Sequence, residues 1–327
     1  DGLVKAGANP PCMLMTVPLF HVTGEVPMLL VSYALGRKII FMPKWDVVNA
    51  MQLIEKEKIT SFTGVPLMSF ELMTHPDRHN YDLSSLQGLA AGGAPRPVDH
   101  VKRLSLDMPT APPALGYGLT ETNGVGAGNF MSNYQEKPNS TGTASRPLVQ
   151  MAILDDAGKQ LPQGDRGEVS IRSVALFSGY WNRPEATADC MTSDGWFRTG
   201  DVGYLDEDGY LFIVDRKKDI IIRGGENISC QEVEAAIYEN KGVAEACVFG
   251  LPDERLGEVV GAAVHLHAGI ALDEAALRDF LSHHLAGFKV PLRIWFHTQP
   301  LPRLGTEKLD KVGLRKRYQA EWAKASA

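Results

Sequence analysis

Two different rhythms of apolar and polar residues run along this chain of 327 residues. From residue 38 to 116, short apolar runs alternate with segments that carry apolar residues every three or four positions. The runs are typical of buried strands, and the wider spacing is typical of helices with one apolar face. We predict strands at 38–42, 59–63, 86–91 and 114–116, and helices at 46–58, 67–73 and 97–106. This alternation predicts a largely parallel α/β sheet, whose ligands bind beyond the carboxyl ends of its strands.

The rhythm changes near residue 149. Short apolar runs separated by the turn sequences 155–158, 164–165 and 206–209 predict a small antiparallel sheet or barrel. After Lys218 the pattern is that of a compact α+β domain, in which Ser229 and Glu232 form a capping box and Asp273 caps a later helix. We therefore expect an α/β part at 1–148, a β-rich part at 149–215 and an α+β domain at 219–327, with the boundary at 215–219.

Composition and charge exclude several classes of protein. With 44% hydrophobic and 22% charged residues, the chain is an ordinary globular protein, and its net charge of −6 argues against a nucleic-acid-binding surface. No run approaches the roughly 20 apolar residues of a membrane-spanning helix. The four cysteines show neither CxxC nor zinc-ligand spacing, which indicates reduced thiols in a cytoplasmic protein. Because Asp1 is not a natural start, we expect the chain to begin inside a larger polypeptide.

The most informative segment is 195–234. Thr199-Gly200-Asp201 is expected to form a turn, and two strand-like runs then form a hairpin that ends at Arg216. Asp201 and Arg216 stand at the two ends of this predicted hairpin. A carboxylate accepts and a guanidinium donates charge-assisted hydrogen bonds, so the pair suits the hydroxyls of a ribose. Alone, either residue is an ordinary turn or surface residue; together they favour a function.

A glycine-rich loop, 116–122, follows a predicted strand. Its glycines permit close approach of a ligand to the backbone. The Tyr117 ring can face a base, the Thr120 hydroxyl can donate to a phosphate oxygen, and Glu121 is a hard oxygen ligand suited to Mg²⁺. Taken alone, a structural loop with a capping Thr-Glu pair explains the same residues equally well.

Lys308 and His21 are weaker candidates. Lys308 lies in a polar loop before the last predicted helix and can bring a positive charge to a phosphate or carboxylate, although a solvated lysine has the same pattern. His21 lies in an apolar segment, where a lone histidine is more often a core residue than a catalyst. The sequence contains no HExxH, GxxxxGK[ST] or GxSxG motif.

Taken in order, five segments between residues 18 and 308 resemble the adenylate-forming superfamily of acyl-CoA synthetases, luciferases and peptide-synthetase adenylation domains. Each segment is common, but the ordered set is specific. The resemblance implies that 1–148 is the C-terminal part of a large α/β domain, with 149–215 as its β-rich subdomain. Residues 219–327 would then be a small mobile domain that rotates about Lys218. The family's Ser/Thr/Gly-rich phosphate loop is absent, so the sequence resembles the C-terminal two-thirds of a longer enzyme.

The resemblance also implies a role for each matching residue. It assigns nucleotide binding to Gly93, Ala94, Pro95, Gly116, Tyr117, Gly118, Thr120, Asp201, Arg216 and Lys308. It assigns catalysis to Lys308, Thr120, Glu121 and His21, Mg²⁺ binding to Glu121, and the border of the CoA tunnel to Gly224 and Gly225. Glu307 stands where the family usually has glycine, which could stiffen the loop that carries Lys308.

The activity implied is that of an ATP-dependent acid–CoA ligase, which forms an acyl-adenylate and then an acyl-CoA thioester with ATP, Mg²⁺ and CoA. The segments 224–227 and 288–291 resemble CoA ligases more than peptide-synthetase domains, and a fatty or aryl acid is expected. Two alternatives stay open: acyl transfer to a carrier-protein thiol, and a nucleotide-binding fragment without turnover. The expected partners are small molecules rather than nucleic acid, and a homodimer is compatible with these features.

Overall fold

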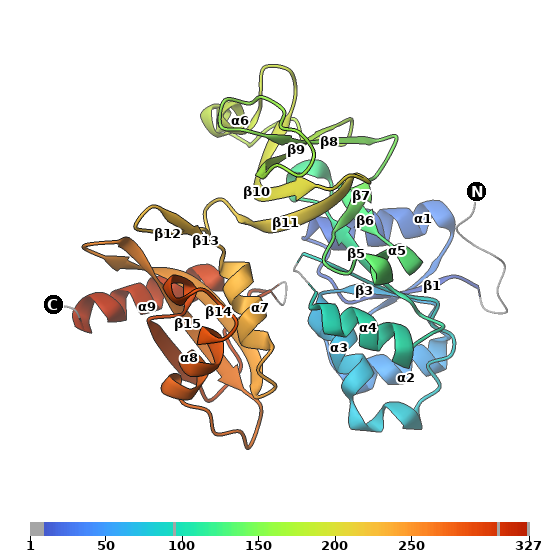
Figure 1. Cartoon of the computed structure of the whole chain (residues 1–327). Helices are drawn as coiled ribbons and strands as arrows, with labels where there is room; N and C mark the ends of the chain where they lie inside the picture. The colour runs from blue at the N-terminus through green and yellow to red at the C-terminus, as the bar shows by residue number, and fades with distance from the viewer. Residues whose placement is uncertain (1–9, 94–95, 306–307, 326–327) are drawn as a thin grey trace. The chain divides into compact units, whose positions relative to one another are not determined.

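The computed structural model describes residues 10–93, 96–305 and 308–325 (Figure 1). The chain divides into two compact units. Unit 1 comprises 1–199 and 203–213, and unit 2 comprises 200–202 and 214–327. Within the described residues, an eleven-stranded sheet and a separate five-stranded sheet are each covered by helices, which confirms the α/β fold class expected from the sequence.

Parallel strands form one half of the large sheet, in the order β2-β1-β3-β4-β5. They are β1 (Cys12–Met15), β2 (Lys38–Phe41), β3 (Ser61–Gly64), β4 (Gly88–Gly92) and β5 (Pro113–Tyr117). The connections between them include α2 (Val47–Glu57), α3 (Pro66–Thr74) and α4 (Val98–Asp107). Asp46 begins α2 by accepting a hydrogen bond from the backbone N–H of Asn49 at 2.7 Å. The elements predicted from the apolar rhythm are all present within two or three residues.

The core of this half lies between the sheet and its helices. Phe62 of β3 and Leu89 of β4 are buried against Ile54 of α2, Leu72 of α3 and Leu104 of α4. Each of these side chains stands at a position that the sequence pattern predicts to be apolar. Strand and helix therefore form here because each can bury one apolar face. Shorter elements complete unit 1: η1 (Gly24–Leu30), α1 (Val31–Leu35), η2 (Pro76–Asn80), η3 (Thr120–Thr122), α5 (Met131–Glu136) and α6 (Pro184–Cys190).

Antiparallel strands form the other half of the large sheet. They are β6 (Ala127–Asn129), β7 (Gly142–Ala144), β8 (Val149–Leu154), β9 (Gly167–Ser173), β10 (Phe197–Leu205) and β11 (Tyr210–Arg216). The order β5-β6-β7-β11-β10-β9-β8 shows that the predicted β-rich part is hydrogen-bonded to the parallel strands through β6 and β7. The small antiparallel sheet expected from the sequence is therefore continuous with the parallel strands.

The turn predicted at Thr199-Gly200-Asp201 is wrong. These residues lie inside β10, and the chain reverses at 206–209 instead, where Asp206 accepts hydrogen bonds from the N–H groups of Asp208 and Tyr210. Gly200 has a φ of +74°, which glycine adopts freely. A strand can therefore continue through a Gly-Asp pair that is otherwise typical of turns.

Unit 2 is built on a long antiparallel pair, β14 (Val243–Asp253) and β15 (Gly257–Leu266), with helices on both faces. The other elements are β12 (Ile221–Arg223), β13 (Glu226–Ile228), β16 (Arg293–His297), α7 (Cys230–Tyr238), α8 (Glu274–Ser282), η4 (Gly287–Lys289) and α9 (Lys311–Ala325). Ala246 and Val248 pack with α7 and α8, whereas Cys247 and Phe249 pack with α9. This alternation is the period of two that a strand covered on both faces requires.

The predicted caps of unit 2 are present at two helices. The backbone N–H of Glu232 donates to Ser229 Oγ at 3.1 Å at the start of α7, and that of Ala276 donates to Asp273 Oδ1 at 2.8 Å at the start of α8. The Glu232 carboxylate, expected to complete the capping box, pairs with Lys289 at 2.5 Å. Among the residues that the structure describes, no helix has both the length and the apolar character needed to cross a bilayer.

Candidate active site

Glycines line the carboxyl ends of β4 and β5. Gly92 lies opposite Gly116 in the parallel register, and a Cβ on Gly92 would come within 3.1 Å of the Gly116 carbonyl oxygen. Gly93 follows with a φ of +74°, in the left-handed region that favours glycine. Ala94 and Pro95, predicted to contact adenine, lie outside the described residues. The two strand ends thus leave exposed backbone at the edge where ligands of parallel sheets bind.

The loop after β5 folds back tightly on itself. A Cβ on Gly118 would lie 2.5 Å from the backbone carbon and oxygen of Gly124, so this position accepts only glycine without a shift of the backbone. The Gly124 N–H donates to the Leu119 carbonyl at 2.9 Å, and Leu119 N–H donates to Thr122 Oγ1 at 3.0 Å. This fold presents a half-buried Tyr117, an exposed Thr120 and a half-buried Glu121 on one loop.

Glu121 has a hydrogen-bond partner that sequence reasoning missed. Tyr180 Oη donates to Glu121 Oε1 at 2.6 Å, and the Phe177 N–H donates to the Glu121 carbonyl at 2.8 Å. Burial and the Glu121 carboxylate together raise the pKa of Tyr180, so its hydroxyl stays a donor. Tyr180 lies 59 positions after Glu121, so no short sequence motif could have predicted this pair.

The donor set around Glu121 is sparse. Within the described part of the chain, no group of three His, Cys, Asp or Glu side chains could hold a metal ion. Mg²⁺ in nucleotide sites is usually held by one or two carboxylates together with substrate phosphates and water. A single Glu121 carboxylate, oriented by Tyr180, fits that role.

His21 is half-buried before η1. Its Nδ1 accepts a hydrogen bond from the backbone N–H of Thr23 at 3.2 Å, which leaves the proton of a neutral ring on Nε2. Gly24 is packed against the carbonyl of Pro18, so any larger residue would displace the segment that carries His21. The ring is thus oriented by its own backbone.

In unit 2, Asp201 and Arg216 are in direct contact. Arg216 Nε donates to Asp201 Oδ1 at 3.1 Å, and the Lys217 N–H donates to the Gly200 carbonyl at 2.8 Å beside it. Only 4% of the Asp201 side chain is exposed, against 50% of the Arg216 side chain. The nearly buried carboxylate of Asp201 is therefore oriented by the guanidinium of Arg216, whose side chain is half exposed to solvent.

Lys308 lies on the outgoing limb of a loop whose described residues are 302–305 and 308–310. The Leu304 N–H donates to the Lys308 carbonyl at 2.8 Å, and the Asp310 N–H donates to the Pro302 carbonyl at 2.9 Å. Burial lowers the pKa of Lys308, and the positive charge of Arg216 lowers it further. Lys308 is therefore close enough to Arg216 for the two positive charges to repel each other. Glu307 lies outside the described residues.

The predicted hinge lies in a turn that is hydrogen-bonded to other residues of unit 2. Lys218 is exposed between β11 and β12, and its carbonyl accepts a hydrogen bond from Arg315 Nη1 of α9 at 3.3 Å. The buried Asp215, which sequence reasoning missed, accepts from the N–H groups of Arg216 at 2.7 Å and Gln231 at 3.3 Å. The strand before the hinge is thereby attached to the first turn of α7.

Gly224 and Gly225 form the two-residue loop between β12 and β13. Their φ angles of +59° and +92° are both positive, as a type I′ hairpin turn requires. Gly224 N–H donates to the Leu256 carbonyl at 2.7 Å. A Cβ on Gly225 would meet no atom within 4 Å, so this exposed loop tip has open space beside it.

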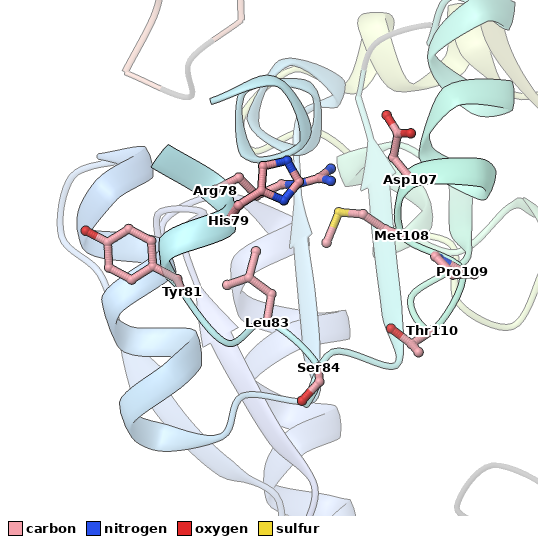
Figure 2. A pocket seen from close by; sticks show the side chains of 9 residues that line it. All are labelled: Arg78, His79, Tyr81, Leu83, Ser84, Asp107, Met108, Pro109 and Thr110. Atoms are coloured by element: carbon pink, nitrogen blue, oxygen red, sulfur yellow. The ribbon is translucent and has the colours of Figure 1, made fainter. Parts of the chain in front are cut away.

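A cavity of about 230 Å³ lies in unit 1, away from the glycine loops that follow β4 and β5 (Figure 2). Leu83 and Ser84 on its wall precede β4, and Met108 and Thr110 precede β5. It therefore opens at the amino ends of these strands, opposite the glycine loops. Its Arg78 already donates to the Met73 carbonyl at 3.1 Å. This cavity does not belong to the candidate active site.

Comparison with known proteins identifies the family. Residues 4–181 match the family model described as AMP-binding enzyme, and residues 232–308 match the AMP-binding enzyme C-terminal domain. The chain belongs to the AMP-binding enzyme family. The resemblance to adenylate-forming enzymes drawn from the ordered motifs is thereby confirmed.

Relatives of this AMP-binding chain include several CoA ligases. It is 39% identical to a long-chain-fatty-acid–CoA ligase of Bacillus subtilis, over 97% of the chain and 55% of that protein. It is 38% identical to a feruloyl-CoA synthase of an Amycolatopsis species, over 93% of the chain and 61% of that protein. The chain thus spans between about half and three-fifths of the length of these relatives.

Solved structures show the same fold. The amide bond synthetase McbA of Marinactinospora thermotolerans superposes with a TM-score of 0.85 at 34% identity, covering 95% of this chain and 62% of that one. ATP-bound MatB of Rhodopseudomonas palustris superposes with a TM-score of 0.84 at 32% identity, covering 95% and 60%. Both neighbours extend well beyond the segment matched here.

Proposed function

We propose that this chain carries most of the nucleotide-binding residues and the small domain of an ATP-dependent acid–CoA ligase. The observation that carries the proposal is the contact between the buried Asp201 carboxylate and Arg216, with Lys308 in electrostatic reach, in a chain of the AMP-binding family. Asp201 would accept and Arg216 would donate hydrogen bonds to the ribose hydroxyls. Tyr117 would stack on the base, at the carboxyl end of β5.

Adenylation turns a carboxylate into a good acyl donor. The substrate carboxylate attacks the α-phosphorus of ATP, the bond to the β-phosphate oxygen breaks, and pyrophosphate leaves. Negative charge builds up on the phosphate oxygens, where Lys308 and the Thr120 hydroxyl would stabilise it; one well-placed donor of this kind supplies about 3–4 kcal/mol. Glu121 would hold Mg²⁺, which supplies further neutralising charge when bound.

Thioester formation follows from the acyl-adenylate. The CoA sulfur attacks the acyl carbon, its proton is lost, and AMP departs. The exposed Gly224-Gly225 loop would border the pantetheine because it carries no side chain to obstruct a narrow ligand. Rotation about Lys218 would exchange Lys308 for this loop between the two half-reactions, a gating step of the domain-closure type.

The substrate class rests on the relatives. Long-chain fatty acids and ferulate are named for the two CoA ligases described above, so we propose a fatty or aryl acid. The amide bond synthetase among the structural neighbours makes an amine a further acceptor to test.

Pyrophosphate release from the full-length protein tests this proposal. A panel of fatty and aryl acids is supplied with ATP and Mg²⁺, and with CoA, a carrier-protein thiol or an amine as acceptor. We expect pyrophosphate with at least one acid and an acyl-CoA product by mass spectrometry. In Asp201→Ala the KM for ATP should rise at least tenfold while that for the acid changes little. Glu207→Ala, at the exposed turn of the same hairpin, is the matched control. Absence of pyrophosphate release with every acid contradicts the proposal.

A further inference from the structure

Two carboxylates of unit 2 hold the two limbs of the loop that carries Lys308. Glu245 of β14, which is 8% exposed, receives the incoming limb. Its Oε1 forms an ion pair with Arg303 Nη2, and its Oε2 accepts a hydrogen bond from the Leu301 N–H at 2.6 Å. Arg303 and Leu309 form a β-bridge across the loop, so this anchor lies at the base of both limbs.

Glu234 of α7 receives the outgoing limb. Its Oε1 pairs with Lys311 Nζ at 2.7 Å and also accepts a hydrogen bond from the Val248 N–H of β14 at 2.8 Å. Lys311 is the first residue of α9 and lies three positions after Lys308. Each limb is therefore attached by one ion pair to a carboxylate: Glu245 belongs to β14, and Glu234 of α7 accepts a hydrogen bond from β14.

We propose that Glu245 and Glu234 are positioning residues that direct Lys308 during adenylation, an inference that rests on the function proposed above. The lysine has a flexible four-carbon stem, so the aim of its ammonium depends on the direction of the backbone that bears it. The described residues between Leu301 and Lys311 are attached to the rest of unit 2 by contacts that include these two pairs and the apolar contacts of Leu301 and Leu309. A misplacement of about 1 Å at a reacting group can cost about 100-fold in rate.

Glu245→Gln isolates the charge, because the amide keeps the size of the side chain and an acceptor for Leu301. We expect the kcat of ATP–pyrophosphate exchange to fall about 10- to 100-fold with little change in the KM for ATP. Thioester formation from supplied acyl-adenylate should stay at the wild-type rate. Glu234→Gln should act in the same direction, and Glu245→Asp should recover part of the loss.

Glu274→Gln is the matched control in the same unit. Glu274 also holds one arginine and one backbone group, Arg293 at 2.8 Å and the Ile294 N–H at 2.9 Å, but on α8 and β16 away from the loop. This variant should leave both half-reactions unchanged. Equal losses in the two half-reactions of Glu245→Gln, or a loss in Glu274→Gln as large as in Glu245→Gln, would assign the carboxylates a general structural role and overturn the inference.

Hydrogen exchange separates this inference from the proposed activity. The Leu304 and Asp310 amides close the loop, so peptides that contain them should exchange several-fold faster in Glu245→Gln and Glu234→Gln, and at the wild-type rate in Glu274→Gln. Unchanged exchange in both glutamate variants overturns the anchoring itself. If the wild-type protein shows no adenylation while exchange responds as expected, the proposed function fails and the anchoring stands.

Discussion

Lys308 lies three residues before Lys311, the first residue of α9, yet the charges around the two lysines differ in sign. Lys311 pairs with Glu234 at 2.7 Å, and this carboxylate raises the pKa of Lys311 in spite of its burial. Lys308 makes no ion pair with any described residue of unit 2, and burial together with Arg216 lowers its pKa. Among the described residues, the charge of Lys311 is thus compensated by a carboxylate, and that of Lys308 is not. A cation kept beside another cation gains most when a phosphate arrives.

Lys308→Ala tests this difference most strongly. Removing the charge that we propose stabilises the transition state should slow adenylation about 10²- to 10³-fold, or about 3–4 kcal/mol. Thioester formation from supplied acyl-adenylate and the melting temperature should change little, because the Lys308 side chain forms no ion pair with the described residues. ATP–pyrophosphate exchange and calorimetry give the two values. A fall in melting temperature as large as that of a Lys311 variant would show that the two lysines are equivalent.

Lys311→Met should do the reverse. It leaves the Glu234 carboxylate buried without its cation, and we expect the free energy of unfolding to fall by about 3 kcal/mol. This value is at the low end of the loss expected when a buried ion pair is broken. The pair is only partly buried, because 31% of the Lys311 side chain and 12% of the Glu234 side chain are exposed. Denaturant titration measures the loss. The double variant with Glu234→Gln should recover part of it, since no unpaired charge then remains.

Much of this arrangement could be predicted where the signal is local. The strands and helices of residues 38–116 follow from apolar periods, and Asp201 and Arg216 were singled out together because one hairpin separates them. The wrong turn at 199–201 came from the ordinary preference of Gly-Asp, which pairing of β10 overrides. The strands β6 and β7, which join the two halves of the sheet, are only three residues each and give no periodic signal.

The partners of the candidate residues could not be predicted. Tyr180 reaches Glu121 across 59 positions, and Arg303 reaches Glu245 across 58. Neither contact produces a recognisable sequence motif, because both form only when elements far apart in the sequence pack together. Glu245 and Glu234 therefore look like ordinary strand and helix carboxylates until the fold is known.

The pH dependence of adenylation sharpens the comparison further. In the proposed function, Lys308 stabilises phosphate only when it is protonated, and its pKa is lowered from the ordinary 10.5. The kcat/KM for ATP, which reports the free enzyme, should therefore fall as pH rises through a midpoint below 10.5. Lys311, whose pKa is raised, stays charged across the same range. Thioester formation from supplied adenylate should lack this alkaline limb. A midpoint at or above 10.5 would contradict the environment described for Lys308.

Arg216→Gln should give the smallest change, a shift of the alkaline midpoint. It tests how much of the lowered pKa of Lys308 is due to the charge of Arg216. Burial is the larger cause of the lowered pKa of Lys308, and the charge of Arg216 is the smaller one. Removing the charge should move the alkaline midpoint upward, yet leave it below 10.5 because burial remains. The midpoint must be read from kcat/KM for ATP, which reports the free enzyme, because bound phosphate would itself raise the pKa of Lys308. The variant also loses the donor that binds Asp201, so the position of the midpoint and not the size of kcat/KM is compared. Arg223→Gln, on β12 of the same unit, is the matched control and should leave the midpoint in place. A return of the midpoint all the way to 10.5 would mean that Arg216 alone distinguishes Lys308 from a solvated lysine.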